Sequence, residues 1–249
     1  MTDPPHPPPL HEALDRLTST FRGMTAGADE IQCECHWGSA EELASLKVPD
    51  AELSPDLLRR TMRAPDWDDQ ASVLRRVLPQ LGAVMADGDL VGYDLPGLGY
   101  AIARGGWQRW PTEQAAAVRT FLESWWVHCL TSADAPSAHE AFALCTEAAG
   151  TAEPWLVIWE SLDQPSANRR LGELVDEWGL NLLGDDLPWS TIDREEQKLR
   201  ELTTWLLVHA SSRLAGHERL LNIVSRLALT GPVRWADPDW PYPASAWKN

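Results

Sequence analysis

The sequence predicts an all-α protein, and three observations lead to this prediction. Apolar residues recur at three- and four-residue spacing along most of the chain, which is the period of a helix with one buried face. Helix-capping patterns or prolines precede several of these segments. The chain has 249 residues, of which 44% are hydrophobic, and one domain of this length can bury roughly 70–75% of its unfolded surface without disulfides.

The first predicted helices begin at recognisable signals. A proline-rich stretch, residues 1–9, is expected to be disordered, and a helix begins directly after it. Ser39 is followed three residues later by a glutamate, which makes a capping box, and Ser54 precedes a proline at the first helical position. The acidic residues within 66–69 indicate the start of a further helix, because negative charges are favourable at the positive N-terminal end of the helix dipole. We expect Pro79 to kink or break this helix.

Residues 87–106 interrupt the helical pattern. This stretch contains six glycines, and short apolar runs lie on either side of Leu95-Pro96-Gly97. We therefore expect a short non-helical insertion near 87–106, either a loose hairpin or a long loop. Long loops in compact domains are often functional or mobile.

The helical pattern resumes at residue 111 and ends near residue 229. The full set of predicted helices is 10–21, 39–47, 54–62, 66–81, 111–130, 137–149, 153–162, 166–183, 190–214 and 217–229. The tail, residues 231–249, contains four prolines and three tryptophans. It cannot be helical, and its aromatic residues predict that much of it docks on the body of one domain, 10–249.

A faint internal repeat relates two predicted helical hairpins. A shift of 81 residues places the segment 119–128 on 200–209, and a shift of 78 residues places His139-Glu140 on His217-Glu218. This spacing is about twice a HEAT or armadillo unit. We predict helical hairpins stacked as an irregular HEAT-like α-solenoid, with a compact helical bundle as the alternative.

The charge of the chain restricts its partners. The formal net charge is −16. This charge disfavours binding to nucleic acid and to anionic membrane surfaces, because proteins bind both through Lys and Arg side chains that neutralise their negative charges. A protein partner, and a basic one in particular, is compatible with this charge. No apolar run approaches the roughly 20 residues of a membrane helix, and no secretory signal precedes the first helix, so we expect a cytoplasmic protein.

The segment Cys33-Glu34-Cys35-His36 is the sharpest candidate site. Two thiolates and an imidazole are zinc ligands, so Cys33, Cys35 and His36 could bind zinc. The spacing is unusual, there is no second ligand pair, and a fourth ligand would come from elsewhere; the nearest in sequence are His6, His11, Asp29 and Glu30. The alternative is a loop-to-helix junction in which Cys35 and Trp37 pack inward. In a reducing cytosol we expect thiols or metal ligands rather than disulfides, and we expect Cys129 and Cys145 in the core.

Motifs that would identify an enzyme are absent from the sequence. There is no G-x-S-x-G, no Walker A loop, no G-x-G-x-x-G and no HExxH. The acids within 66–69 and the pair Asp185-Asp186 could serve Mg²⁺ or acid–base chemistry, but helix N-termini attract carboxylates for structural reasons. If the chain is an enzyme, we expect the site near 87–110, with Asp66, Asp69 or Arg104 close to it.

Fourteen tryptophans are many for this length. Six lie on the apolar faces of predicted helices and are expected in the core: Trp125, Trp126, Trp155, Trp159, Trp178 and Trp205. Others lie at helix starts or in loops, where a tryptophan can anchor a partner. These interaction candidates are Trp107, Trp110, Trp189, Trp235 and Trp240, together with Trp247.

Several short motifs resemble those of a family of Trp-rich helical proteins from actinomycetes, for which no activity is established. They are Cys35-His36-Trp37-Gly38-Ser39, Glu41–Ala44, Leu46-Lys47, Leu57–Arg60, Ala64–Trp67, Arg104–Trp110, Leu187–Trp189 and Thr230–Pro232 with Trp235. The resemblance covers most of the chain after its first 30 residues. It implies one contiguous domain and supplies no catalytic residue and no cofactor.

These observations favour a non-enzymatic helical protein-binding module, of the kind found among immunity and regulatory proteins. An enzyme with a site near residues 87–110 is one alternative. A zinc-stabilised or metal-sensing protein built on Cys33, Cys35 and His36 is another.

Overall fold

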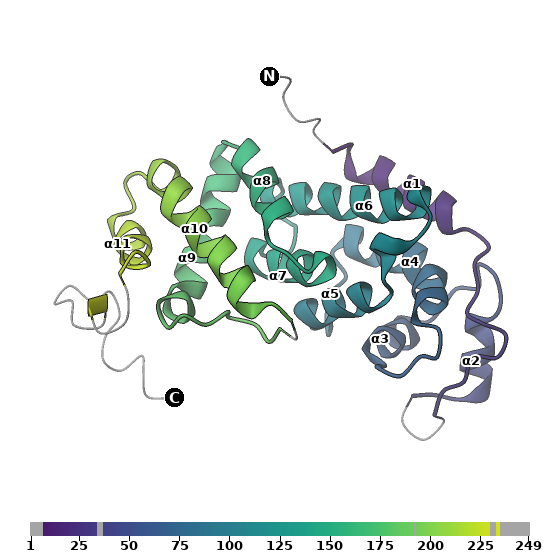
Figure 1. Cartoon of the computed structure of the whole chain (residues 1–249). Helices are drawn as coiled ribbons and strands as arrows, with labels where there is room; N and C mark the ends of the chain where they lie inside the picture. The colour runs from purple at the N-terminus through teal and green to yellow at the C-terminus, as the bar shows by residue number, and fades with distance from the viewer. Residues whose placement is uncertain (1–6, 34–36, 192, 230–232, 235–249) are drawn as a thin grey trace.

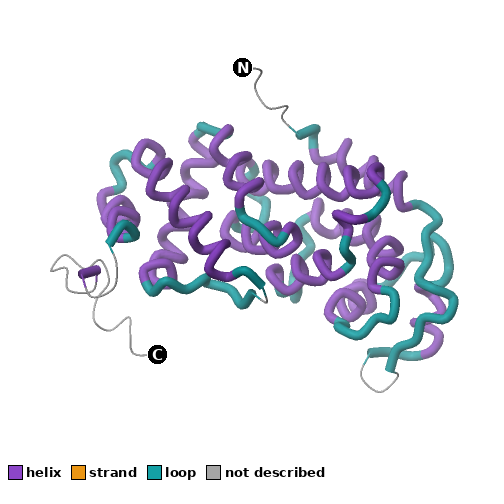
Figure 2. Tube along the Cα trace, viewed as in Figure 1, coloured by secondary structure: helices purple, strands orange, loops and turns teal. Residues whose placement is uncertain are grey.

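The computed structural model describes residues 7–33, 37–191, 193–229 and 233–234, and in this part of the chain it contains eleven α-helices, one short 3-10 helix and no strand (Figures 1 and 2). The prediction of an all-α protein is therefore confirmed. The elements are α1 Leu10–Phe21, α2 Ala40–Leu46, α3 Pro55–Arg63, α4 Gln70–Asp87, α5 Leu95–Arg104, η1 Trp107–Arg109, α6 Thr112–Thr131, α7 Ala138–Ala149, α8 Glu153–Ser161, α9 Pro165–Leu183, α10 Glu195–Arg213 and α11 Glu218–Arg226.

The helices form an elongated array in which the most extensive contacts join helices that are not consecutive in the sequence. Figure 1 shows α1 to α4 at one end and α9 to α11 at the other, with α5 to α8 between them. Helix α1 packs on α4 and α6, α5 packs on α7, and α9 packs on both α7 and α11. This arrangement fits a helical bundle or a solenoid-like stack, and the HEAT-like repeat stays a prediction.

One continuous apolar core runs through the array, and tryptophans are its largest members. The six tryptophans expected in the core are all buried. Several indole N–H groups donate to backbone carbonyls of other elements: Trp125 to Met85 at 2.9 Å, Trp126 to Trp155 at 2.9 Å and Trp159 to Ala167 at 3.2 Å. Each ring thus fills volume and also satisfies its polar edge, as a buried indole requires.

The expectation of a non-helical insertion near 87–106 is wrong for most of that segment. Helix α4 continues through Pro79 to Asp87 and ends at Gly88, whose φ of 73° is the left-handed conformation that glycine adopts readily. After a short turn, Pro96 lies in the first turn of α5, where proline is tolerated.

The glycines of α5 serve close packing rather than a loop. A Cβ atom on Gly99 would lie 2.2 Å from the carbonyl oxygen of Leu144, so the backbones of α5 and α7 could not approach as they do with any larger residue. Close helix contact and loop formation both select glycine, and the sequence pattern does not distinguish them.

No helix in the described segments combines the length and the apolarity that crossing a bilayer requires. The predicted disordered residues 1–6 and the tail residues 235–249 lie outside the described residues, so the expected docking of the tail stays a prediction.

Candidate functional site

An open apolar groove lies between α8 and α10. Its volume is about 540 Å³. Helix α8 contributes Leu156 and Val157, and α10 contributes Thr204, Trp205 and Val208. Charged and polar side chains also line it: Glu153, Arg200, Glu201 and His209.

The valines of this groove are exposed because each helix carries apolar residues beyond its buried face. In α8, Trp155, Leu156 and Trp159 are buried, whereas Val157 is 50% exposed. In α10 the apolar run continues past Trp205 and Leu206 to Leu207 and Val208, which are 39% and 64% exposed. Single exposed apolar residues are ordinary on a protein surface, but Val157 and Val208 line the same hollow, which makes it the candidate site.

Glu201 fixes the two walls of the groove against each other. Its Oε2 accepts hydrogen bonds from the backbone N–H of Ala152 at 2.7 Å and of Glu153 at 3.2 Å, and from the hydroxyl of Thr151 at 2.9 Å. A carboxylate from α10 therefore caps the N-terminus of α8, where unpaired N–H groups and the helix dipole favour a negative charge.

Stacked rings underlie the groove. The ring of Trp205 stacks on Trp159 with centroids 5.5 Å apart, and His209 stacks on Trp205 at 5.2 Å. The guanidinium of Arg213 lies 5.8 Å from the Trp205 ring centroid, within reach of a cation–π interaction. The imidazole of His209 lies 3.7 Å from the carboxylate of Glu160.

The surroundings of the groove are acidic. Glu153 lines it, and Glu160 lies one turn beyond Leu156 on α8 with its side chain 53% exposed. Arg200 is the cation on the opposite wall, and it already forms an ion pair with Glu196 at 3.4 Å.

The interaction tryptophans that the sequence suggested do not form this site. Trp107, Trp110 and Trp189 are buried, and their indole N–H groups donate to the carbonyls of Ala148 and Gly105 and to the carboxylate of Glu147, respectively. The structure thus places these three rings in the core. Trp235, Trp240 and Trp247 lie outside the described residues.

The predicted zinc segment is only partly described. Cys35 and His36 lie outside the described residues, as does His6, whereas Cys33 is disulfide-bonded. Cys33 therefore differs from the expected free thiol, whereas zinc binding by this segment stays a prediction. Within 7–33, 37–191, 193–229 and 233–234, no three His, Cys, Asp or Glu side chains are grouped so as to hold a metal ion.

Glu30, one of the nearest possible fourth ligands, has a structural role. Its carboxylate is buried and accepts hydrogen bonds from the backbone N–H of Asp68 at 2.8 Å and of Asp69 at 3.0 Å, at the N-terminus of α4. Asp69 in turn is the N-cap of α4 and accepts from the N–H of Ser72 at 3.0 Å. Asp66 is exposed. Glu30 and Asp69 therefore stabilise the start of α4.

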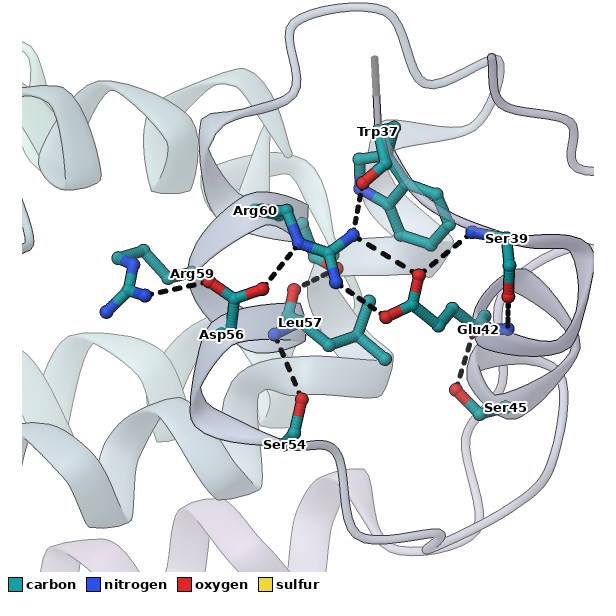
Figure 3. A network of polar contacts seen from close by, with 10 residues as sticks. Trp37, Ser39, Glu42, Ser45, Ser54, Asp56, Leu57, Arg59 and Arg60 are labelled. Carbon is teal, nitrogen blue, oxygen red and sulfur yellow. Dashed lines mark hydrogen bonds and ion pairs between the residues drawn. The ribbon is translucent and has the colours of Figure 1, made fainter. Parts of the chain in front are cut away.

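The motifs around Trp37 meet in one network of polar contacts (Figure 3). Arg60 on α3 donates to Glu42 at 2.6 Å, to Asp56 at 2.8 Å and to the carbonyl oxygen of Trp37. A Cβ atom on Gly38 would lie 2.5 Å from an Arg60 nitrogen. Glu42 also completes the predicted capping box at the start of α2.

An aromatic contact joins the same region to the start of α4. The rings of Trp37 and Trp67 meet edge to face with centroids 5.1 Å apart. The indole N–H of Trp67 donates to the carbonyl of Thr61 at 3.0 Å, near the end of α3. These side chains therefore hold α2, α3 and the start of α4 together.

Asp185, one residue of the remaining acidic pair, has a structural role. Asp185 accepts from the guanidinium of Arg234 at 2.9 Å, and Arg234 donates to the carbonyl of Leu183 at the end of α9 as well. Neither Asp185 nor Asp186 lines the α8–α10 groove.

With this geometry in hand, comparison with known proteins adds no relative: no family model matches the chain, and neither a curated protein nor a solved structure matches it.

Proposed function

We propose that the chain is a non-enzymatic helical module that binds a protein partner through the α8–α10 groove. The observation that carries this proposal is the pair of exposed valines, Val157 and Val208, that face the same apolar hollow from two helices. An amphipathic helix of a partner can lay its apolar face into such a groove.

Charge narrows the class of partner. The groove has glutamates on both walls, and the chain as a whole carries a formal charge of −16. A segment with Lys or Arg beside its apolar residues is attracted electrostatically to this surface. The partner is therefore a basic amphipathic segment of another protein, as regulatory and immunity proteins recognise.

Site-specific photo-crosslinking tests this proposal. A photo-reactive phenylalanine derivative replaces Val208, and the crosslinked peptide is sequenced after exposure in lysate of the native host. Val48 is the control, because it is 50% exposed, compared with 64% for Val208, and lies outside the groove. We expect position 208 to capture one peptide with apolar residues at helical spacing and adjacent Lys or Arg, and position 48 not to capture it.

The sign of a charge placed in the groove gives a second test with the captured peptide. Val208→Lys should weaken its binding more than Val208→Glu, because only lysine repels a basic segment. Added salt should reduce this difference. Capture of the same species at positions 48 and 208, capture of an acidic peptide, or equal effects of the two variants would each contradict the proposal.

A further inference from the structure

A separate cavity lies where the C-terminal ends of α5 and α7 meet the segment that begins α10 (Figure 1). Its volume is about 300 Å³, which is at the lower limit of sites that bind small molecules. None of the described residues lines both this cavity and the α8–α10 groove. Five of the side chains that line the cavity are charged: Arg104, Glu147, Asp193, Arg194 and Lys198.

The carboxylate of Glu147 is a buried acceptor on the wall of this cavity. Its side chain is 4% exposed, and its Oε1 accepts hydrogen bonds from the indole N–H of Trp189 and from the ammonium group of Lys198, both at 2.8 Å. Its Oε2 accepts no hydrogen bond from the described residues and is not shielded from solvent. Because Glu147 and Lys198 both line the cavity, Oε2 is open toward it. A ligand therefore meets a carboxylate whose position is already fixed.

The ion pair with Lys198 determines which kind of donor suits this oxygen. The ammonium group of Lys198 is buried and also donates to the hydroxyl of Thr191 at 2.6 Å. It balances the charge of Glu147, so an ammonium group on the ligand would be repelled by a like charge beside the same carboxylate. A neutral hydroxyl donates without this repulsion, and hydrogen bonds to a charged acceptor are the stronger kind.

The other charges of the cavity favour one negative charge on the ligand. The carboxylate of Asp193 lies 3.6 Å from Nε of Arg194 and balances it. Arg104 has no carboxylate partner in the described part of the chain, and its guanidinium donates instead to the backbone carbonyls of Ala64 and Pro65. One positive charge on the cavity wall therefore stays unbalanced, and a monoanion would balance it.

Arg194 can supply the N–H groups that bind this negative charge. Its side chain is 58% exposed, and Nη1 and Nη2 have no partner among the residues that the structure describes. Arg194 is the N-cap of α10 and has a φ of 57°. This left-handed conformation is uncommon for residues other than glycine, asparagine and aspartate, so the choice of arginine is not explained by the backbone.

We propose that this cavity binds a small hydroxy acid as its monoanion. A hydroxyl of the ligand donates to Glu147 Oε2, and the carboxylate of the ligand faces the guanidinium groups of Arg104 and Arg194. Gln108 and Asp193 offer further polar groups on the wall, which suit additional hydroxyls of a polyhydroxy acid. The site is distinct from the α8–α10 groove and does not depend on it.

Isothermal titration calorimetry of the full chain with gluconate, hexanoate and sorbitol tests the assignment. These compounds have carbon chains of the same length, but hexanoate lacks the hydroxyls and sorbitol lacks the charge. We expect saturable binding of gluconate, and binding of the other two that is weaker by about tenfold or more. Absence of saturable gluconate binding, or equal binding of hexanoate or of sorbitol, would overturn the proposal.

Arg194→Asn removes one cation of the site and places there a residue that accepts the left-handed conformation. Arg169→Asn is the matched control, because its side chain is 56% exposed, compared with 58% for Arg194, and lies outside the cavity. The first substitution should weaken gluconate binding by about threefold or more, a modest effect because the side chain is half exposed. The second should leave the affinity unchanged. Equal effects of the two variants would also overturn the proposal.

Glu147→Gln combined with Lys198→Met tests the acceptor. This double variant removes both buried charges together, so the net charge of the cavity stays the same. It should weaken gluconate binding by about tenfold or more, because a charged acceptor is lost. Unaltered gluconate affinity would contradict the role of Glu147 and with it the proposal. If tryptophan fluorescence shows that the double variant is unfolded, the three ligands and the two arginine variants decide.

Discussion

The close approach of α5 and α7 makes a quantitative prediction about Gly99. In Gly99→Ala the new methyl group would lie 2.2 Å from the carbonyl oxygen of Leu144, whereas ordinary van der Waals contact begins at 3.4 Å. The obstacle is backbone, so relief requires the two helices to separate by about 1 Å. Overpacking of this kind typically costs about 1–3 kcal/mol, which outweighs the gain of about 1 kcal/mol from alanine in a helix.

Gly172→Ala is the matched control for this prediction. Gly172 also lies inside a helix, α9, but a Cβ atom there would meet only the side chains of Leu220 at 3.4 Å and Leu214 at 3.7 Å. This variant should be neutral or up to about 1 kcal/mol more stable than wild type.

Urea unfolding followed by tryptophan fluorescence measures both variants, because the buried indoles become exposed on unfolding. We expect the midpoint to fall for Gly99→Ala and to stay or rise for Gly172→Ala. If Gly99→Ala were as stable as Gly172→Ala, the explanation of the α5 glycines by close packing would be refuted.

Three further predictions concern buried ionisable groups. Lys198→Met should destabilise the fold by about 3–5 kcal/mol in urea unfolding, because it leaves the carboxylate of Glu147 buried without its 2.8 Å ion-pair partner. Burial lowers the pKa of His128 below its ordinary 6.5. The neutral imidazole therefore contributes stability above pH 6.5, and this contribution is lost as the pH falls through the lowered pKa. His128→Gln should for this reason reduce the loss of unfolding free energy between pH 7 and 5. Cys129 and Cys145 should resist alkylation by iodoacetamide in the native protein, as mass spectrometry would show, because burial raises the pKa of both thiols.

Each of these predictions has a control or a contradicting outcome. Adding Glu147→Gln to Lys198→Met should recover part of the lost stability, and no recovery would refute the buried-charge explanation. An unchanged pH dependence of stability in His128→Gln would contradict the effect of burial on that imidazole. Alkylation of the two thiols in urea should be complete, and equal labelling without urea would contradict their burial.

Most of the fold could be predicted because most helices begin at a local sequence signal, such as an N-cap residue or a proline in the first turn. The capping box at Ser39 and the proline after Ser54 are present as the sequence suggests. Residues 95–104 could not be assigned, since a glycine that permits close helix packing and one that permits a turn look alike in one sequence.

The candidate groove was harder to predict than the fold. The sequence contained a signal for it, because the run Trp205–Val208 covers more of a helix than one buried face. Which of these residues α8 leaves uncovered depends on tertiary packing. The same dependence explains why Trp107, Trp110 and Trp189, at helix starts and in loops, are buried.

The indole hydrogen bonds have a consequence for how the helices end. Besides Trp125, which bonds the Met85 carbonyl in the last turn of α4, Trp67 bonds Thr61 near the end of α3, Trp110 bonds Gly105 just after α5, and Trp107 bonds Ala148 in the last turn of α7. The last carbonyls of a helix have no partner within it. In each case an indole N–H from another segment of the chain donates to a carbonyl near the C-terminus of a helix, and so ties that segment to the helix end. Four of the fourteen tryptophans thus close a helix end with the indole N–H.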